Sequence, residues 1–162
     1  MATLALPIRE LELSVRVDAD KARAETECVV FYSQARRTSP SFAMTFKLAL
    51  AIAFLKFMLR SLAQHQKKLI RAYQETDFTR FSNEDLLSIC ESLEKIVEQA
   101  RPVLSRLADL GPRGQSWLGT TLPQLEEQVG HLYSISQSLR VATDPEASVL
   151  MAVAVQHMAA RA

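Results

Sequence analysis

The chain has 162 residues, of which 48% are hydrophobic and 23% charged, with a formal net charge of +1. A chain of this length can bury roughly two thirds of its unfolded surface, so it needs neither a disulfide nor a metal to fold. Its four glycines and six prolines are too few for a many-stranded sandwich or barrel, in which a turn recurs about every 8–12 residues. Composition therefore predicts a mainly α protein with a single domain, 1–162.

Charge is distributed unevenly along the chain. Residues 1–82 contain 13 Lys/Arg and 8 Asp/Glu, a balance of +5, whereas residues 83–162 contain 6 and 10, a balance of −4. The simplest interpretation is a weak attraction between two halves of one domain. The alternative is that the first half recognises an acidic partner or anionic lipid.

The two cysteines, Cys28 and Cys90, are too far apart in sequence for a redox or metal motif. Because both stand among apolar residues, we expect them to be buried in a protein of a reducing compartment, the cytoplasm. The N-terminal apolar stretch is too short for a secretory signal. A start at Met44 would give one, but Lys56 and Arg60 interrupt its apolar run, so this interpretation is the weaker one.

The N-terminal region, residues 1–40, supports two interpretations. Apolar and polar residues alternate over 10–18, the pattern of a half-buried strand, and the β-branched and aromatic run at 26–32 would pair with it. The intervening residues are helix formers without Gly or Pro, so a helix over about 19–36 is the alternative. We therefore expect a mixed or partly irregular region with a short β segment, ending before Pro40.

The next segment, 42–75, predicts one long helix that begins after Ser41, a residue suited to cap it. Residues 42–59 contain no Gly or Pro and only two charges, Lys47 and Lys56, and the remainder of the segment is amphipathic with a basic face. The apolar part is just long enough to span a membrane. Between the two lysines, however, lie only eight residues, about 12 Å of helix against a hydrocarbon core of about 30 Å. We therefore expect a core or oligomer-interface helix, with a membrane span as the alternative.

Two segments of matched length predict an antiparallel helical hairpin at about 82–142. Apolar residues recur at steps of four and three over 86–107 and again over 118–139, and the loop GPRGQ joins the two runs. Ser82 is suited to cap the first helix, with Asp85 at the answering position. A further helix, 144–161, is predicted from its proline-containing start and its almost wholly apolar sequence.

No residue pattern supports catalysis, a cofactor or a metal. None of the three histidines stands three or four residues from another histidine or a cysteine, as a helical zinc pair would require. Glu127 and His131 share a helix face but are typical of a surface pair. There is no phosphate-binding glycine loop and no nucleophile elbow. The sequence therefore favours a protein that is not an enzyme, and a hydrolase whose catalytic residues meet only in the folded chain stays an alternative.

One set of residues stands out as a candidate interaction surface. It combines the basic face of the long helix with the single tryptophan, in the set Arg60, Lys67, Lys68, Arg71 and Trp117. The basic residues lack a nucleic-acid-binding motif, so nucleic acid is not the favoured partner. Beside an apolar helix they are typical of a solvated face or of the cytoplasmic flank of a membrane segment.

Together these patterns predict a helical interaction or structural protein that acts through self-association or through a helical protein partner. The alternative is a small membrane-associated protein with an apolar helix at 42–59 and a basic cytoplasmic flank at 60–71.

Overall fold

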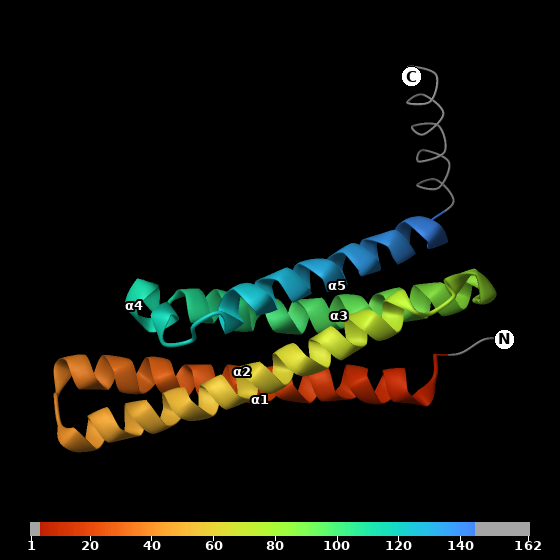
Figure 1. Ribbon diagram of the computed structural model, residues 1–162. Helices are drawn as coiled ribbons and strands as arrows, with labels where there is room; N and C mark the ends of the chain where they lie inside the picture. Colours follow the sequence, from red (N-terminus) through yellow and green to blue (C-terminus); the bar gives the residue numbers. More distant parts are fainter. Residues whose placement is uncertain (1–3, 145–162) are drawn as a thin grey trace.

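The computed structural model describes residues 4–144, and in this part of the chain all regular structure is helical. The prediction of a mainly α helical bundle is therefore confirmed. Figure 1 shows the elements, which are α1 (Leu6–Thr38), α2 (Phe42–Gln74), the 3₁₀ helix η1 (Phe78–Arg80), α3 (Asn83–Ala108), α4 (Gly111–Ser116) and α5 (Thr121–Thr143).

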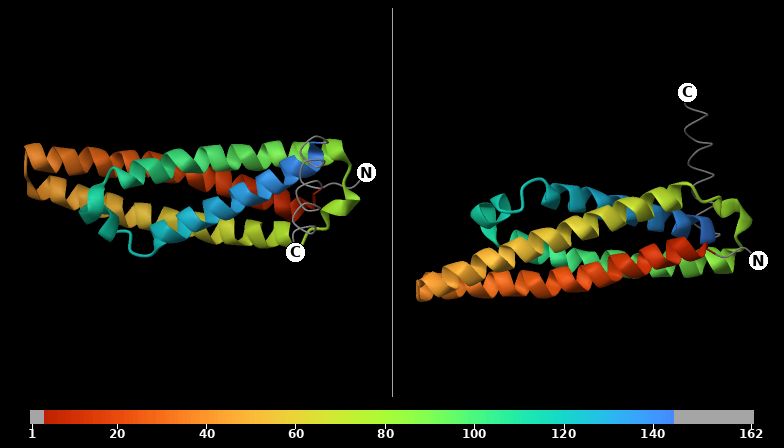
Figure 2. Two further views of the ribbon diagram at one scale, coloured as in Figure 1. Left: turned by 90° about the horizontal axis from the view of Figure 1, so that it is seen from above. Right: turned by 60° about the horizontal axis from the view of Figure 1, so that its bottom comes forward.

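The four long helices form two antiparallel hairpins, α1 with α2 and α3 with α5. The hairpins stack so that α1 packs against α3 and α2 against α5. Both views in Figure 2 show that the turn between α1 and α2 extends well beyond the end of the α3–α5 hairpin. The first part of α2 therefore has α1 on one side and no helix of the second hairpin on the other.

The N-terminal region contains one continuous helix, Leu6–Thr38, so the predicted β segment and irregular region are wrong. The alternative prediction, a helix over about 19–36, is confirmed, and the helix extends further at its start. The buried side chains of α1 include Val15, Ala19, Ala22 and Thr26, which recur at steps of four and three. Residues three and four apart share a helix face, and Val15, Ala19 and Ala22 of this face belong to the hydrophobic core of the bundle. Apolar and polar residues do alternate over 10–18. Because these residues are helical, however, the apolar ones do not share one face: some are buried in the core and others are exposed to solvent.

The long helix predicted at 42–75 is confirmed as α2. The Ser41 hydroxyl accepts a hydrogen bond from the Met44 N–H at 3.1 Å, which caps the helix as expected. Its buried side chains run from Leu48 to Tyr73. The Tyr73 hydroxyl also donates to the carboxylate of Glu12 on α1, so this end of α2 is held to α1 by a polar contact as well as by packing.

The second hairpin is α3 and α5, in the region predicted for it. The Ser82 hydroxyl accepts from the Asp85 N–H at 3.2 Å, and Leu93 and Leu132 are fully buried. The connecting loop was predicted to be irregular but contains the short helix α4. The predicted helix at 144–161 lies outside the described residues except for Asp144, which ends α5.

The cysteines differ in their environment. Cys90 is buried as expected, whereas Cys28 is exposed on α1. The apolar neighbours of Cys28 in sequence, Val29 and Val30, are buried, but a helix turns by about 100° per residue, and Cys28 itself faces away from them.

Candidate interaction surface

The outer face of α2 carries an exposed apolar stripe. Its members recur at steps of three or four residues over about 22 Å of helix, and the most exposed, Phe42 and Phe57, are 88% and 73% accessible. The stripe consists of Phe42, Phe46, Leu50, Phe54 and Phe57. Five large apolar side chains in one line are more than the scattered exposed residues expected on a soluble monomer.

Of the expected core or oligomer-interface helix, the core interpretation is therefore wrong for the first half of α2, and the oligomer-interface interpretation stays a prediction. Only 22% of its most apolar 18-residue window is buried. Among the described helices, α2 alone is long and apolar enough to cross a membrane by length and composition. The physical reason is the unequal length of the two hairpins, which leaves the first turns of α2 beyond α3 and α5, with the connection that contains α4 near Leu48.

The basic residues predicted as an interaction surface continue the same face. Arg60, Lys67, Lys68 and Arg71 are all exposed on α2, and at 100° per residue each lies within about 80° of the middle of the apolar stripe. Between Cys28 and Gln74 the chain contains eight Lys/Arg and no Asp/Glu. The outer face of α2 is therefore apolar over its first half and basic over its second half.

The two lysines inside the apolar half lie on either side of the stripe. Lys47 and Lys56 are nine positions apart, which places them half a turn from each other and each about a quarter turn from the stripe. Lys47 is exposed and Lys56 half-buried. Long basic side chains on the flanks of an apolar helix face can keep their charge in water while the face itself is covered.

Trp117, the fifth predicted residue, lies elsewhere. It is half-buried after α4 and lines a cavity together with Leu48, near the start of α2. Arg60 is 12 residues further along the helix, a distance of about 18 Å. The structure therefore brings the four basic residues together on one face and leaves Trp117 outside it.

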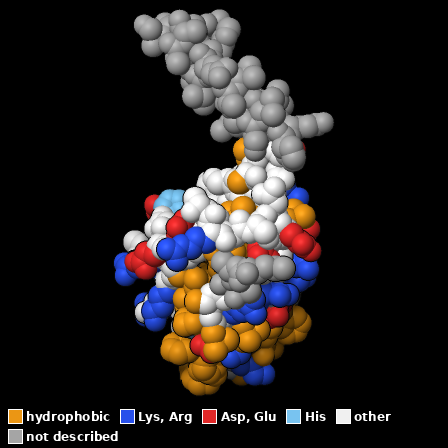
Figure 3. All heavy atoms as spheres, turned by 90° about the vertical axis from the view of Figure 1, so that its right-hand side faces the viewer, with side chains coloured by type: hydrophobic (Ala, Val, Ile, Leu, Met, Phe, Trp, Pro, Cys, Tyr) orange, Lys and Arg blue, Asp and Glu red, His pale blue; other side chains and the backbone are white. Residues whose placement is uncertain are grey.

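The space-filling view shows where apolar side chains gather. In Figure 3 hydrophobic atoms dominate the lower part of the molecule, the side that α1 and α2 occupy in Figure 1. The exposed apolar residues of α1 include Leu13 and Phe31, which are both 63% accessible. The phenylalanines of 42–59 were not assigned to one face from the sequence, because the segment as a whole predicted a core or oligomer-interface helix. Their regular spacing along one face was a usable signal, but the strong apolar character of the whole segment obscured it.

A groove between α2 and α5 brings together other residues from the sequence analysis. Its lining includes Lys67 and Arg71 from α2 and Glu127 and His131 from α5. Within the described residues, no hydrogen bond or ion pair joins Glu127 to His131. Most of the residues that line the groove are polar, and it extends the basic half of the α2 face toward α5.

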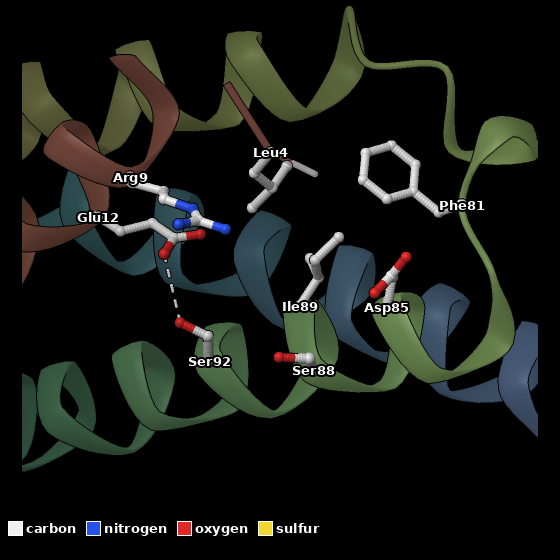
Figure 4. Close-up of a pocket in the computed structure, with 8 residues that line it drawn as sticks. All are labelled: Leu4, Arg9, Glu12, Phe81, Asp85, Ser88, Ile89 and Ser92. Carbon is white, nitrogen blue, oxygen red and sulfur yellow. Dashed lines mark hydrogen bonds between the residues drawn. The ribbon is translucent and has the colours of Figure 1, made fainter. Parts of the chain in front are cut away.

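Another cavity lies at the opposite end of the bundle from the α1–α2 turn, where hydrogen bonds join neighbouring helices. Figure 4 shows Arg9 and Glu12 of α1 above Ser92 of α3, with Leu4 and Phe81 along its edge. The Ser92 hydroxyl donates to Glu12 at 3.3 Å. Since Glu12 also accepts from Tyr73, this carboxylate links α1, α2 and α3.

Residues 4–144 contain no cluster of three or more His, Cys, Asp or Glu side chains that would hold a metal ion. Comparison of the chain with protein-family models, with curated proteins and with solved structures gives no match.

Proposed function

We propose that this protein works by contact, as a helical bundle that docks the outer face of α2 on an anionic membrane surface. The observation that carries this proposal is the continuous face on which an exposed phenylalanine stripe leads directly into four basic residues. Apolar insertion combined with attraction to anionic lipid is how interfacial helices bind.

Both halves of this face favour binding, and the apolar half contributes the larger share. Burying a large apolar side chain from full exposure stabilises by about 1.5–3 kcal/mol, and each basic residue near an anionic surface contributes about 1 kcal/mol. The chain has no acidic residue between 28 and 74, so this segment carries no negative side chain that an anionic membrane surface would repel. The flanking positions of Lys47 and Lys56 suit a helix that lies in the plane of the interface.

Lying on the membrane fits the contacts of α2 better than spanning it. Asp18 of α1 accepts a hydrogen bond from the Ser61 hydroxyl at 3.0 Å and lies 2.6 Å from Nδ1 of His65. Tyr73 donates to Glu12 further along the same interface, toward the end of α2. A spanning α2 would break these contacts or bring the charged residues of α1 into the hydrocarbon, where each costs about 2.5–3.5 kcal/mol at the centre.

Self-association through the same stripe is the second candidate. The stripe is straight and confined to one helix, so two copies could pair in an antiparallel arrangement centred near Leu50. Such a pairing would cover the phenylalanines but leave the basic half of the face without an opposite charge. The membrane surface satisfies both halves, and we therefore favour it.

The test is sedimentation of the full-length protein with phosphatidylcholine vesicles, with and without phosphatidylserine. We expect binding to the anionic vesicles and about tenfold or greater loss of affinity in the double variant Phe46→Ser/Phe54→Ser, since each 1.4 kcal/mol is a factor of ten. Leu87→Ser is the matched control, because Leu87 is an exposed apolar residue on α3 and its loss should leave binding unchanged.

Light scattering after size-exclusion chromatography separates the two candidates. A dimer that the stripe variant converts to a monomer, with no binding to vesicles, would establish self-association instead. A monomer that binds vesicles of neither composition would show that the α2 face serves neither membrane docking nor self-association.

A further inference from the structure

A cavity of about 380 Å³ lies where the end of α1, the start of α2 and α4 meet. Arg36 and Arg37 reach it from α1 and Arg113 from α4, while Trp117 and Leu48 form part of its apolar wall. Among the described residues, none that lines it is acidic. Three arginines from two segments far apart in sequence therefore line the same cavity.

The acidic side chains closest in sequence to this cavity are already occupied. Arg106 of α3 binds Glu27 of α1, with Nε 2.7 Å from Oε1 and Nη2 3.2 Å from Oε2. Its Nη1 also donates to Asp109 at 3.3 Å. Within the described residues, the cavity arginines form no ion pair, so their charge is available to a ligand.

We propose that this cavity binds an organic phosphate, with the phosphate group held by Arg36, Arg37 and Arg113. Guanidinium groups pair with phosphate oxygens in a bidentate manner, and charge-assisted hydrogen bonds of this kind are about twice as strong as neutral ones. The apolar body of the ligand packs against Trp117 and Leu48. The cavity volume falls in the range of small-molecule sites, about 300–1,000 Å³.

This inference does not depend on membrane docking by the α2 face. A phosphate with an apolar body can come from a soluble compound or from a phospholipid headgroup, and the cavity chemistry is the same for both. The α1–α2 turn stands beside the exposed Phe42, so a headgroup could reach the cavity when that end of the protein lies on a bilayer.

Trp117 lines this cavity and is the single tryptophan of the chain, so the tryptophan fluorescence comes from one side chain in its wall. Titration of the full-length protein with phenyl phosphate provides the soluble arm of the test, with phenol as the uncharged control. Vesicles of phosphatidylcholine with phosphatidic acid provide the lipid arm. We expect a saturable change in Trp117 emission with phenyl phosphate and none with phenol.

The arginines are tested one at a time by Arg36→Gln and Arg113→Gln, each of which should weaken phenyl phosphate binding about tenfold or more. The matched control is Arg16→Gln, because Arg16 is exposed on α1 about 30 Å from Arg36 along the helix and should bind as the wild type does. Circular dichroism checks that each variant keeps its helix content.

A response to phosphatidic acid vesicles alone that Arg113→Gln abolishes would support the site with a lipid as its ligand. No saturable response in either arm, or equal affinities in the arginine variants and the wild type, would overturn the proposal. The double variant Phe46→Ser/Phe54→Ser should retain phenyl phosphate binding, so failure of the membrane proposal and failure of this one are distinguishable.

Discussion

Two guanidinium nitrogens of Arg140 on α5 donate hydrogen bonds to the carboxylate of Glu94 on α3. Nη2 lies 2.7 Å from Oε2 and also 2.7 Å from Oε1, and Nε donates to Oε1 at 3.0 Å. Cys90, one turn earlier on α3, places its Sγ 3.3 Å from the same Oε1. This half-buried cluster joins the two helices of the second hairpin.

The Glu94–Arg140 pair should make stability depend on acid pH. Hydrogen bonding from Arg140 lowers the pKa of the Glu94 carboxyl below its ordinary value. A carboxyl whose pKa is lower in the folded state contributes stability above its unfolded pKa, and this is lost as the pH falls through the folded pKa. We therefore expect the wild type to lose more stability than Glu94→Gln between about pH 5 and pH 3, as measured by urea denaturation.

Glu98→Gln is the matched control for that experiment, because Glu98 is exposed on the same helix. Its acid profile should follow that of the wild type. Identical slopes for Glu94→Gln and the wild type would mean that the ion pair contributes no pH-dependent stability.

The two cysteines should differ sharply in reactivity. Burial, followed by the contact with Glu94, raises the pKa of the Cys90 thiol to about 11, so at pH 8 roughly one molecule in a thousand carries its thiolate, the reactive form. Cys28 is exposed. A thiol reagent at pH 8 should modify one cysteine per native chain and two in denaturant, and Cys28→Ser should remove the native reaction. Rapid modification of Cys90 in native Cys28→Ser would contradict this assignment.

A buried glutamine in α2 should weaken the fold. Gln66 is fully buried, and neither Nε2 nor Oε1 of its amide has a hydrogen-bond partner among the described residues. A buried polar group without a partner costs about 1–3 kcal/mol. Gln66→Leu should therefore raise the free energy of unfolding by about that amount in urea titrations, while Gln64→Leu, at an exposed position of the same helix, should change it by less than about 0.5 kcal/mol. Destabilisation by Gln66→Leu would show that the amide is hydrogen-bonded.

The sequence was most informative where one apolar seam faces one partner. The second hairpin was predicted from the steps of four and three around Leu93 and Leu132 and from the Ser82 cap. A helix that buries a single apolar stripe has its apolar residues at a regular helical spacing, which is visible in the sequence. At 10–18 the same reasoning failed. The small buried residues of α1, Ala19 and Ala22, carry a weak signal, and the stronger alternation of larger residues favoured a strand.

Tertiary relationships explain the other differences. Whether Phe46 and Phe54 are buried depends on how far the α1–α2 hairpin extends past the other one, which no local pattern specifies. The arginine-lined cavity likewise joins Arg36 to Arg113 across two segments that meet only in the folded chain. Of the predicted surface, the four basic residues were found together because they belong to one helix, whereas Trp117 belongs to a different element.

Core substitutions in the second hairpin should be costly. Leu93 and Leu132 are fully buried, and large-to-small changes at such sites cost about 2–5 kcal/mol because they lose buried surface and leave a cavity. We expect losses of this size for Leu93→Ala and Leu132→Ala in urea denaturation, and a much smaller one for the exposed Leu87→Ala. Unchanged midpoints in both core variants would mean that the seam is not part of the folding core.

The lysines beside the apolar stripe provide the sharpest test of how α2 meets a membrane. If the helix lies in the interface plane, Lys47 and Lys56 reach the headgroups from its two flanks. Reversing both charges in Lys47→Glu/Lys56→Glu should then cost at least about 2 kcal/mol, or about thirtyfold in affinity for phosphatidylserine vesicles. The loss should shrink as salt is added, because the Debye length falls from about 10 Å at 0.1 M to about 3 Å at 1 M. Lys95→Glu changes the charge of α3 instead. Lys95→Glu is compared with the double variant by the loss of affinity per reversed charge. If that loss were equal in the two proteins, the net charge and not the α2 face would control the association. The orientation proposed for α2 would then be wrong.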